Sequence, residues 1–131
     1  MAQSTSSFFE LSSSVKHYPT FSYAQMKDDI LGKKYELSLA FIGDTIAKKL
    51  NATHRKKTYI PNVLSFPLTE TQGEIFIAPS VAKKEAKKFN MTPDGYIGFL
   101  YIHALLHLKG LDHGDTMEKA EQKYCKKYTL Q

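Results

Sequence analysis

The stretch HALLHLKGLDH, residues 103–113, decides how this chain folds and which chemistry it can support. We expect its first half to end a long helix, which would place His103 and His107 four residues apart on one face. Gly110 permits the left-handed backbone that ends a helix, so the chain can turn back and bring His113 towards the other two. Three protein ligands with an open fourth position are typical of a catalytic zinc site. The stretch therefore predicts a three-histidine metal site.

A lone histidine beside apolar residues is more often an ordinary core or surface residue than a ligand. Here three of the chain's five histidines fall within eleven residues, at helical spacing and around a turn glycine, which favours metal. Neutral imidazole suits one Zn²⁺ ion, which would lower the pKa of a bound water to about 7, although nickel and copper also accept imidazole. Asp112 is either an outer acceptor for the second ring N–H of a ligand or simply a turn residue.

The histidine spacing is also that of the metzincin proteases, but in those enzymes a glutamate directly follows the first histidine and acts as general base. This chain has Ala104 at that position. The ligand geometry survives such a change, whereas the water-activating base of a protease does not. A metzincin-like metallopeptidase is therefore kept only as an alternative, and another carboxylate near the metal, such as Asp94 or Glu118, would favour it.

Two ordered motifs resemble those of the YbeY-type endoribonucleases, the bacterial rRNA maturation factors (UPF0054-like). The first is the histidine stretch, with Leu108, Gly110 and Asp112 between the ligands. The second block comprises Leu50-Asn51, Arg55, the run NVLSFP at 62–67, and Gly73-Glu74-Ile75. The resemblance covers residues 35–121, most of the chain, and two motifs at family-like separation are far more specific than the histidines alone.

The resemblance implies a single-strand-specific, metal-dependent endoribonuclease acting in rRNA processing, including 16S rRNA 3′-end maturation and ribosome quality control. The implied partners are single-stranded RNA and the small ribosomal subunit, with neither DNA nor a membrane expected. Arg55, the only arginine beside seventeen lysines, falls where the family has its functional arginine. A guanidinium fork suits the developing charge of a phosphodiester under cleavage. Asn62 and Ser65 belong to a strand motif that lies beside the metal cleft in the family.

Several positions depart from the family pattern. Ala104 stands where glycine is usual and Leu111 where an aromatic residue is usual, Pro61 replaces a threonine, Glu74 replaces an aspartate, and the segment after His113 is shorter. None of these changes removes a predicted ligand or Arg55. Their effect on substrate preference and efficiency is left open.

Composition indicates one domain, residues 1–131, in which 1–20 form a loosely ordered segment rich in Ser and Thr. The single cysteine, Cys125, excludes an internal disulfide and suits a reducing compartment. No apolar run is long enough for a membrane span, and the first thirty residues lack a signal-peptide core, so we expect a cytoplasmic protein. The net charge of +5 is compatible with a polyanionic partner without requiring one.

Hydrophobic periodicity predicts an α+β fold, a small mixed sheet of about four strands packed with about five helices. Strands are expected within the N-terminal segment and at 35–42, 63–66 and 74–78, and the apolar histidine helix at 92–109 should be central. A polar loop is expected over 51–61, and a capping box of Asp115 and Glu118 should open the last helix.

A third function remains open, that of a non-catalytic ribosome-binding protein with structural zinc. A fourth ligand from the N-terminus or from Cys125 would favour it. Two predicted helices carry groups of lysines, which either are simply exposed to solvent or contact the phosphates of RNA. An unpaired base could stack on Tyr124 or Tyr128. These two groups of lysines are Lys83, Lys84, Lys87, Lys88 and Lys119, Lys123, Lys126, Lys127.

Overall fold

The structure is a computed structural model that describes residues 5–6, 8–112 and 114–131. A mixed sheet packed with α-helices confirms the predicted α+β class and adds one two-residue strand to the four expected. The strands are β1 (Thr5–Ser6), β2 (Phe9–Ser13), β3 (Glu36–Phe41), β4 (Val63–Thr69) and β5 (Gln72–Ile77). The helices are α1 (Tyr23–Leu31), α2 (Asp44–Arg55), α3 (Pro79–Glu85), the 3-10 helix η1 (Ala86–Phe89), α4 (Pro93–Lys109) and α5 (Asp115–Lys127).

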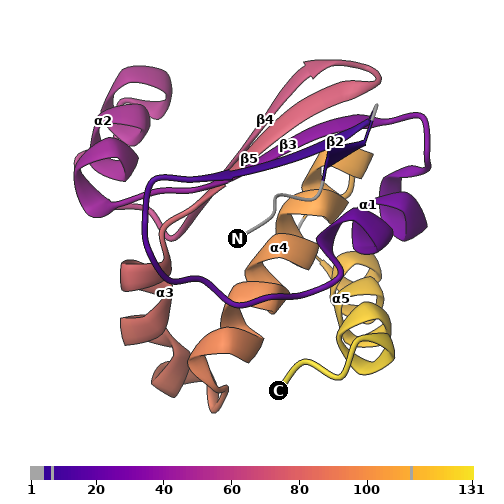
Figure 1. The fold of residues 1–131 in the computed structure, drawn as a ribbon. Coiled ribbons are helices and arrows are strands. Elements are labelled where there is room, and N and C mark those ends of the chain that lie inside the picture. The colour runs from indigo at the N-terminus through magenta and orange to yellow at the C-terminus, as the bar shows by residue number, and fades with distance from the viewer. Residues whose placement is uncertain (1–4, 7, 113) are drawn as a thin grey trace.

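The sheet has the strand order β1-β2-β3-β5-β4, and α1, α4 and α5 pack below it (Figure 1). Strands β2, β3 and β5 run parallel, whereas β4 is an antiparallel edge strand. Buried and more exposed residues alternate along the strands, and the buried ones are aligned across the sheet. Leu11 lies beside Leu39, and Leu39 lies beside Ile75. These three side chains are at most 4% exposed. One face of the sheet thus forms the core.

The histidine helix, α4, lies in the middle of the fold as predicted (Figure 1). It begins where expected, because the Thr92 side chain accepts a hydrogen bond from the Gly95 N–H at 3.0 Å. It ends at Gly110, whose φ of 108° is left-handed. A side chain at Gly73 of β5 would lie 3.1 Å from Leu108, so glycine there permits the close approach of α4 to the sheet. None of the helices in the described ranges has the length and apolar composition to cross a bilayer.

The predicted loop over 51–61 is wrong in its first part, because α2 continues to Arg55. Asn51 is fully buried, at 0% exposed, and its side-chain amide donates to the Tyr59 carbonyl at 3.0 Å. This bond ties the following loop back onto the helix, and Lys56 ends the helix in the left-handed region with φ of 55°. Arg55 is consequently fixed on a helical turn.

The strand expected within the N-terminal segment is β2, in which Phe9 and Leu11 alternate with polar residues and are 2% and 4% exposed. Near the other end of the chain one expectation differs from the structure. The capping box is wrong, since Asp115 is already the first helical residue of α5. Gly114 is the N-cap, and no side chain caps this end.

Candidate active site

A cavity of about 510 Å³ opens between α4, the edge strand β4 and the end of α2. It brings together five of the predicted site residues, which come from three separate parts of the sequence. The described residues that line it are Arg55, Tyr59, Asn62, Val63, Leu64, Ser65, Pro67, His103, Ala104, His107 and Leu108. Tyr59 was not anticipated, because its position depends on the tertiary bond to Asn51.

The two histidines of α4 point to a common spot in this cavity. Their Nε2 atoms lie 3.1 Å apart. Two nitrogens that each lie about 2.0–2.1 Å from one zinc ion must be no more than about 4 Å apart, so the pair fits a shared ion. The predicted third ligand, His113, lies outside the described residues. Within 5–6, 8–112 and 114–131, no group of three metal-binding side chains has the geometry to hold an ion.

A carboxylate of α5 orients the first histidine. His103 Nδ1 contacts Glu121 Oε2, and because an ionised carboxylate only accepts, the ring N–H at Nδ1 donates. Both side chains are largely shielded, at 21% and 13% exposed. A proton at Nδ1 leaves the Nε2 lone pair facing the cavity, which is the tautomer that a metal ligand needs.

Glu121 was missed by the sequence predictions, which named Asp112, Asp94 and Glu118 as carboxylates of interest. The available indication was weak: Glu121 follows Met117 by one helical turn, and Met117 is buried at 1% exposed on the face of α5 turned towards the core. Glu118 is exposed on the same helix, and Asp94 lies at the opposite end of α4 from His107.

Replacing Glu121 with glutamine should weaken zinc binding roughly tenfold to hundredfold, because outer partners of ligating histidines have effects of that size. Competition with a chelating dye would measure the zinc dissociation constant. The matched control is Glu118→Gln, an exposed position one helical turn from Asp115, which should bind zinc like the parent protein. Equal zinc affinity for the parent and Glu121→Gln would show that Glu121 does not position the ligand.

Arg55 lies on the last turn of α2 with its side chain exposed and lining the cavity. In the described part of the chain its guanidinium forms no ion pair. Ser65 is half-buried and pairs in register with Ile75, so its side chain faces α4 and the cavity. A planar cation and a hydroxyl therefore face the histidine pair across one hollow, an arrangement able to hold an anionic group.

Asn62 is tied into the walls of the cavity. Its amide donates to Glu85 Oε1 at 2.8 Å and lies 3.4 Å from the Tyr96 hydroxyl, and its carbonyl oxygen accepts from the Val63 N–H at 2.6 Å. Burial and the nearby Glu85 carboxylate raise the pKa of Tyr96, which keeps this hydroxyl protonated. Asn62 thereby fixes the start of β4 against α3 and α4.

The remaining predicted site residue, Asp112, is exposed in the turn after α4 and is not among the residues lining the cavity. Its pairing with a ligand stays a prediction, since the neighbouring His113 lies outside the described residues. Of the departures from the family pattern, Ala104 is buried at 2% exposed beside the histidines, and Pro61 is buried before β4.

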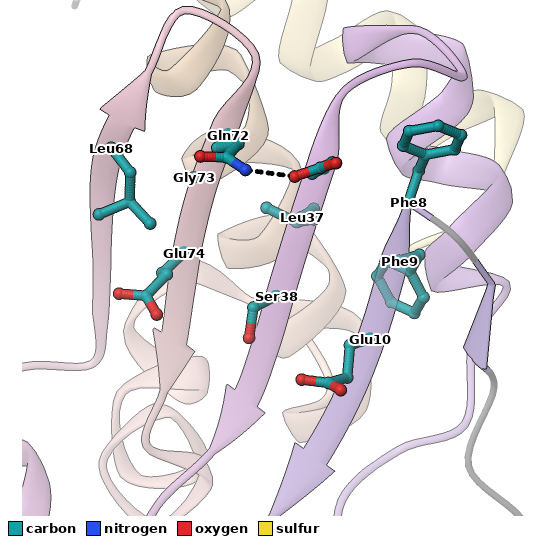
Figure 2. A pocket seen from close by; sticks show the side chains of 10 residues that line it. Phe8, Phe9, Glu10, Leu37, Ser38, Leu68, Gln72, Gly73 and Glu74 are labelled. Carbon is teal, nitrogen blue, oxygen red and sulfur yellow. Dashed lines mark hydrogen bonds between the residues drawn. The ribbon is translucent and has the colours of Figure 1, made fainter.

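The third departure, Glu74, lies on the far side of the sheet from the histidines. It pairs in register with Ser38 of β3, and Figure 2 shows it beside Ser38 and Glu10 in a second hollow of about 340 Å³. In the same hollow Gln72 of β5 donates a hydrogen bond to Glu36 of β3 (Figure 2). The sheet therefore separates Glu74 from the candidate active site, and Glu74 is not among the described residues that line it.

Cys125 lies half-buried on α5 and packs against the core rather than lining the cavity. Burial raises the pKa of its thiol from the ordinary 9.0 to about 11. At pH 8 the thiolate fraction should therefore be about hundredfold lower in the folded protein than in the unfolded chain. We expect alkylation by iodoacetamide to slow at least about that much on folding, measured by mass spectrometry with and without denaturant. Equal rates would show an exposed, ionisable thiol.

Comparison with known proteins shows which family this chain resembles. A family model described as Endoribonuclease YbeY matches residues 3–130. The chain is 37% identical over 95 residues to the Endoribonuclease YbeY of Mycoplasma mycoides subsp. mycoides, covering 64% of this chain and 58% of that protein. It is 34% identical over 113 residues to that of Mesoplasma florum, covering 78% and 63%. The chain thus spans less than two thirds of the length of these curated relatives.

A solved structure shows the same fold. The solution structure of TM1509 from Thermotoga maritima superimposes with a TM-score of 0.66 and covers 92% of this chain and 89% of its own. The two sequences are 22% identical, so this likeness concerns the arrangement of the helices and strands alone.

Proposed function

The chain belongs to the YbeY endoribonuclease family, and from that premise we propose that it is a single-strand-specific metallo-endoribonuclease of rRNA processing. The observation that carries the proposal is the convergence of His103 and His107, Nε2 to Nε2 at 3.1 Å, in a cavity that Arg55 also lines. We further propose 16S rRNA 3′-end maturation and ribosome quality control as its cellular role, with the small ribosomal subunit as partner and the cytoplasm as its location.

One zinc ion is the proposed cofactor, held by His103, His107 and His113, and the donor set of neutral imidazoles suits it. When bound, such an ion supplies Lewis acidity that lowers the pKa of water at an open position to about 7 and polarises phosphoryl oxygens. Glu121 keeps the proton of His103 on Nδ1 and so keeps Nε2 available. Asp112 is proposed to do the same for a neighbouring ligand.

Arg55 has the proposed role of gripping the scissile phosphate. Its fork can donate two parallel hydrogen bonds to the non-bridging oxygens, on which negative charge grows as the phosphodiester is cleaved. Ser65 offers a hydroxyl to the same group from the wall of β4. Asn62 acts indirectly, because its bonds to Glu85 and Val63 hold that wall in place.

The peptidase alternative is less well supported. A metzincin-like protease requires a carboxylate that can take a proton from water at the metal. The carboxylate that reaches the histidine pair among the described residues is Glu121, and it is bonded to Nδ1, the ring nitrogen remote from the cavity. The alternative of a structural zinc site is also less well supported. None of the described residues that line the cavity is a cysteine, aspartate or glutamate that could serve as a fourth ligand and close the site.

Cleavage of a labelled single-stranded RNA by metal-assayed protein tests the proposal, with casein as the parallel substrate and with chelator added in one arm. We expect the RNA to be cut, casein to remain intact, and activity to vanish with chelator and return with zinc. Cleavage of casein would instead support the peptidase. Tightly bound metal with neither substrate cut would contradict free-standing nuclease activity and favour a protein that binds the ribosome without catalysis.

A further inference from the structure

A row of aromatic rings leads out of the candidate active site along one face of α4. Tyr96, Phe99 and His103 recur at helical spacing, and their ring centroids are 6.1 Å apart at each step. Tyr96 and Phe99 are nearly parallel, at 18°. Phe89 of η1 extends the row, because it stacks on Tyr96 with centroids 5.2 Å apart and planes 12° apart. Four rings from two helices thus form one continuous series, which we call the aromatic row.

The outer end of the aromatic row is open to solvent. Phe89 is 58% exposed and takes no part in the buried clusters, whereas Tyr96 behind it is 4% exposed. One face of the Phe89 ring is covered by Tyr96, and the turn that carries it is fixed. The Asn90 N–H donates to the Lys87 carbonyl at 3.2 Å, with Asn90 left-handed at φ 54°. The fold therefore presents a flat apolar ring at a set position and angle.

The inner end of the aromatic row is the cavity itself. His103 lines the cavity, and the Tyr96 hydroxyl lies 3.4 Å from the amide of Asn62, which lines it too. From Tyr96 to His103 the helix rises about 10 Å, the height of about three stacked bases at roughly 3.4 Å each. Tyr96 is buried and Phe99 is half-buried, so the ring with a free face for a base is Phe89, and a strand held there lies about three bases from the candidate active site.

The segment that leads to Phe89 is rich in exposed positive charge. Four exposed lysines occupy α3 and η1 in the residues just before Phe89: Lys83, Lys84, Lys87 and Lys88. The acidic residue among them, Glu85, is turned inward and engaged by Asn62 and Tyr96. Flat aromatic faces flanked by cations are the combination by which proteins hold single-stranded nucleic acid, because bases stack on the rings and phosphates meet the ammonium groups.

We propose that Phe89, supported from behind by Tyr96 at the outer end of the aromatic row, is a stacking platform for an unpaired base of the RNA strand that enters the active site. The inference rests on the proposed nuclease function and adds a reason for preferring single strands, because the faces of bases inside a duplex are covered by the neighbouring stacked bases. Phe89 is better placed for this role than Tyr124 of α5 or Tyr128, which directly follows α5. The Tyr128 hydroxyl donates to Asp29 of α1, and Tyr124 is half-buried beneath the Lys123 ammonium, 5.3 Å from its ring centroid.

The absence of tryptophan from the chain gives a direct test, because Phe89→Trp introduces a single fluorophore into the platform. The ligand is a nuclease-resistant, 2′-O-methylated single-stranded RNA, compared with a duplex of the same sequence and with a strand carrying abasic sites. We expect the Phe89→Trp protein to bind the single strand like the parent, with its emission quenched by stacking. The duplex and the abasic strand should leave the emission unchanged.

Phe89→Leu removes the ring but keeps the bulk, and it should weaken binding of the single strand by roughly fivefold to hundredfold. On cleavable RNA the loss should fall on KM and leave kcat near that of the parent, since Phe89 lies away from the reacting phosphate. Phe8→Leu is the matched control, because it makes the same change at a 39% exposed ring directly before β2. It should change neither the affinity for the single strand nor KM.

Two results would overturn the platform while leaving the nuclease intact. One is cleavage and binding by Phe89→Leu equal to those of the parent. The other is equal affinity of the parent for abasic and base-bearing strands, which would mean that Phe89 is exposed for a different partner, such as a protein. Failure of the parent protein itself to bind and cut any single-stranded RNA would instead refute the proposed function.

Discussion

His107→Ala is expected to abolish zinc binding and RNA cleavage together. The Nε2 atoms of His107 and His103 lie 3.1 Å apart, so removing one ring takes away half of the donor pair that the described residues show. An ion that polarises phosphoryl oxygen and activates water contributes several kcal/mol to the transition state, which corresponds to at least about a thousandfold loss of kcat/KM. Metal content by mass spectrometry and cleavage of labelled single-stranded RNA measure the two effects on the same preparation.

The control for this substitution is His17→Ala, since His17 is exposed and lines a different hollow of the molecule. Its metal content and activity should match those of the parent. Thermal unfolding of both variants distinguishes loss of a ligand from loss of the fold. Full activity of His107→Ala without bound zinc would contradict the metal site. If another divalent ion, but not zinc, restored activity to the metal-free parent protein, the cofactor would be assigned wrongly.

The histidine pair was predictable because both residues lie on one regular helix. The helical period places His103 beside His107, and the Thr92 cap and the left-handed Gly110 mark the ends of that helix in the sequence as in the structure. Hydrophobic periodicity likewise predicted strands at 35–42 and 74–78, where the structure has β3 and β5 with alternate residues buried. The regular period of a helix or strand was therefore enough to predict these features, whereas the capping box expected at Asp115 was not formed.

Features that depend on packing between distant elements were not predicted. Asn51 was expected to begin a loop, because a polar residue is usually exposed, but it is buried in α2 and its side-chain amide donates to the distant Tyr59 carbonyl. Glu121 is eighteen residues from His103, so its contact depends on how α5 packs against α4. Phe89 joins the aromatic row through the turn after α3, whose geometry no periodicity encodes.

Arg55→Ala is expected to retain zinc and lose cleavage. The guanidinium lies on the last turn of α2, remote in sequence from the histidines but lining the same cavity. Removing one preorganised donor to a developing oxyanion lowers kcat by about a hundredfold to a thousandfold. Metal content should match that of the parent, because Arg55 donates no ligand. Single-turnover cleavage of labelled RNA separates this loss in the chemical step from weaker binding.

Two neighbouring variants sharpen the interpretation of Arg55→Ala. Lys57→Ala removes a cation from the exposed loop that follows α2 and should change the salt dependence of binding only slightly, so it controls for net charge. Arg55→Lys keeps the charge but loses the planar fork, and its kcat should fall between those of Arg55→Ala and the parent. If Arg55→Lys were fully active, simple charge would suffice. If Arg55→Ala were fully active, the residue would have no role in cleavage, and the anion-binding side of the cavity would have to be sought at Ser65 and the other lining residues.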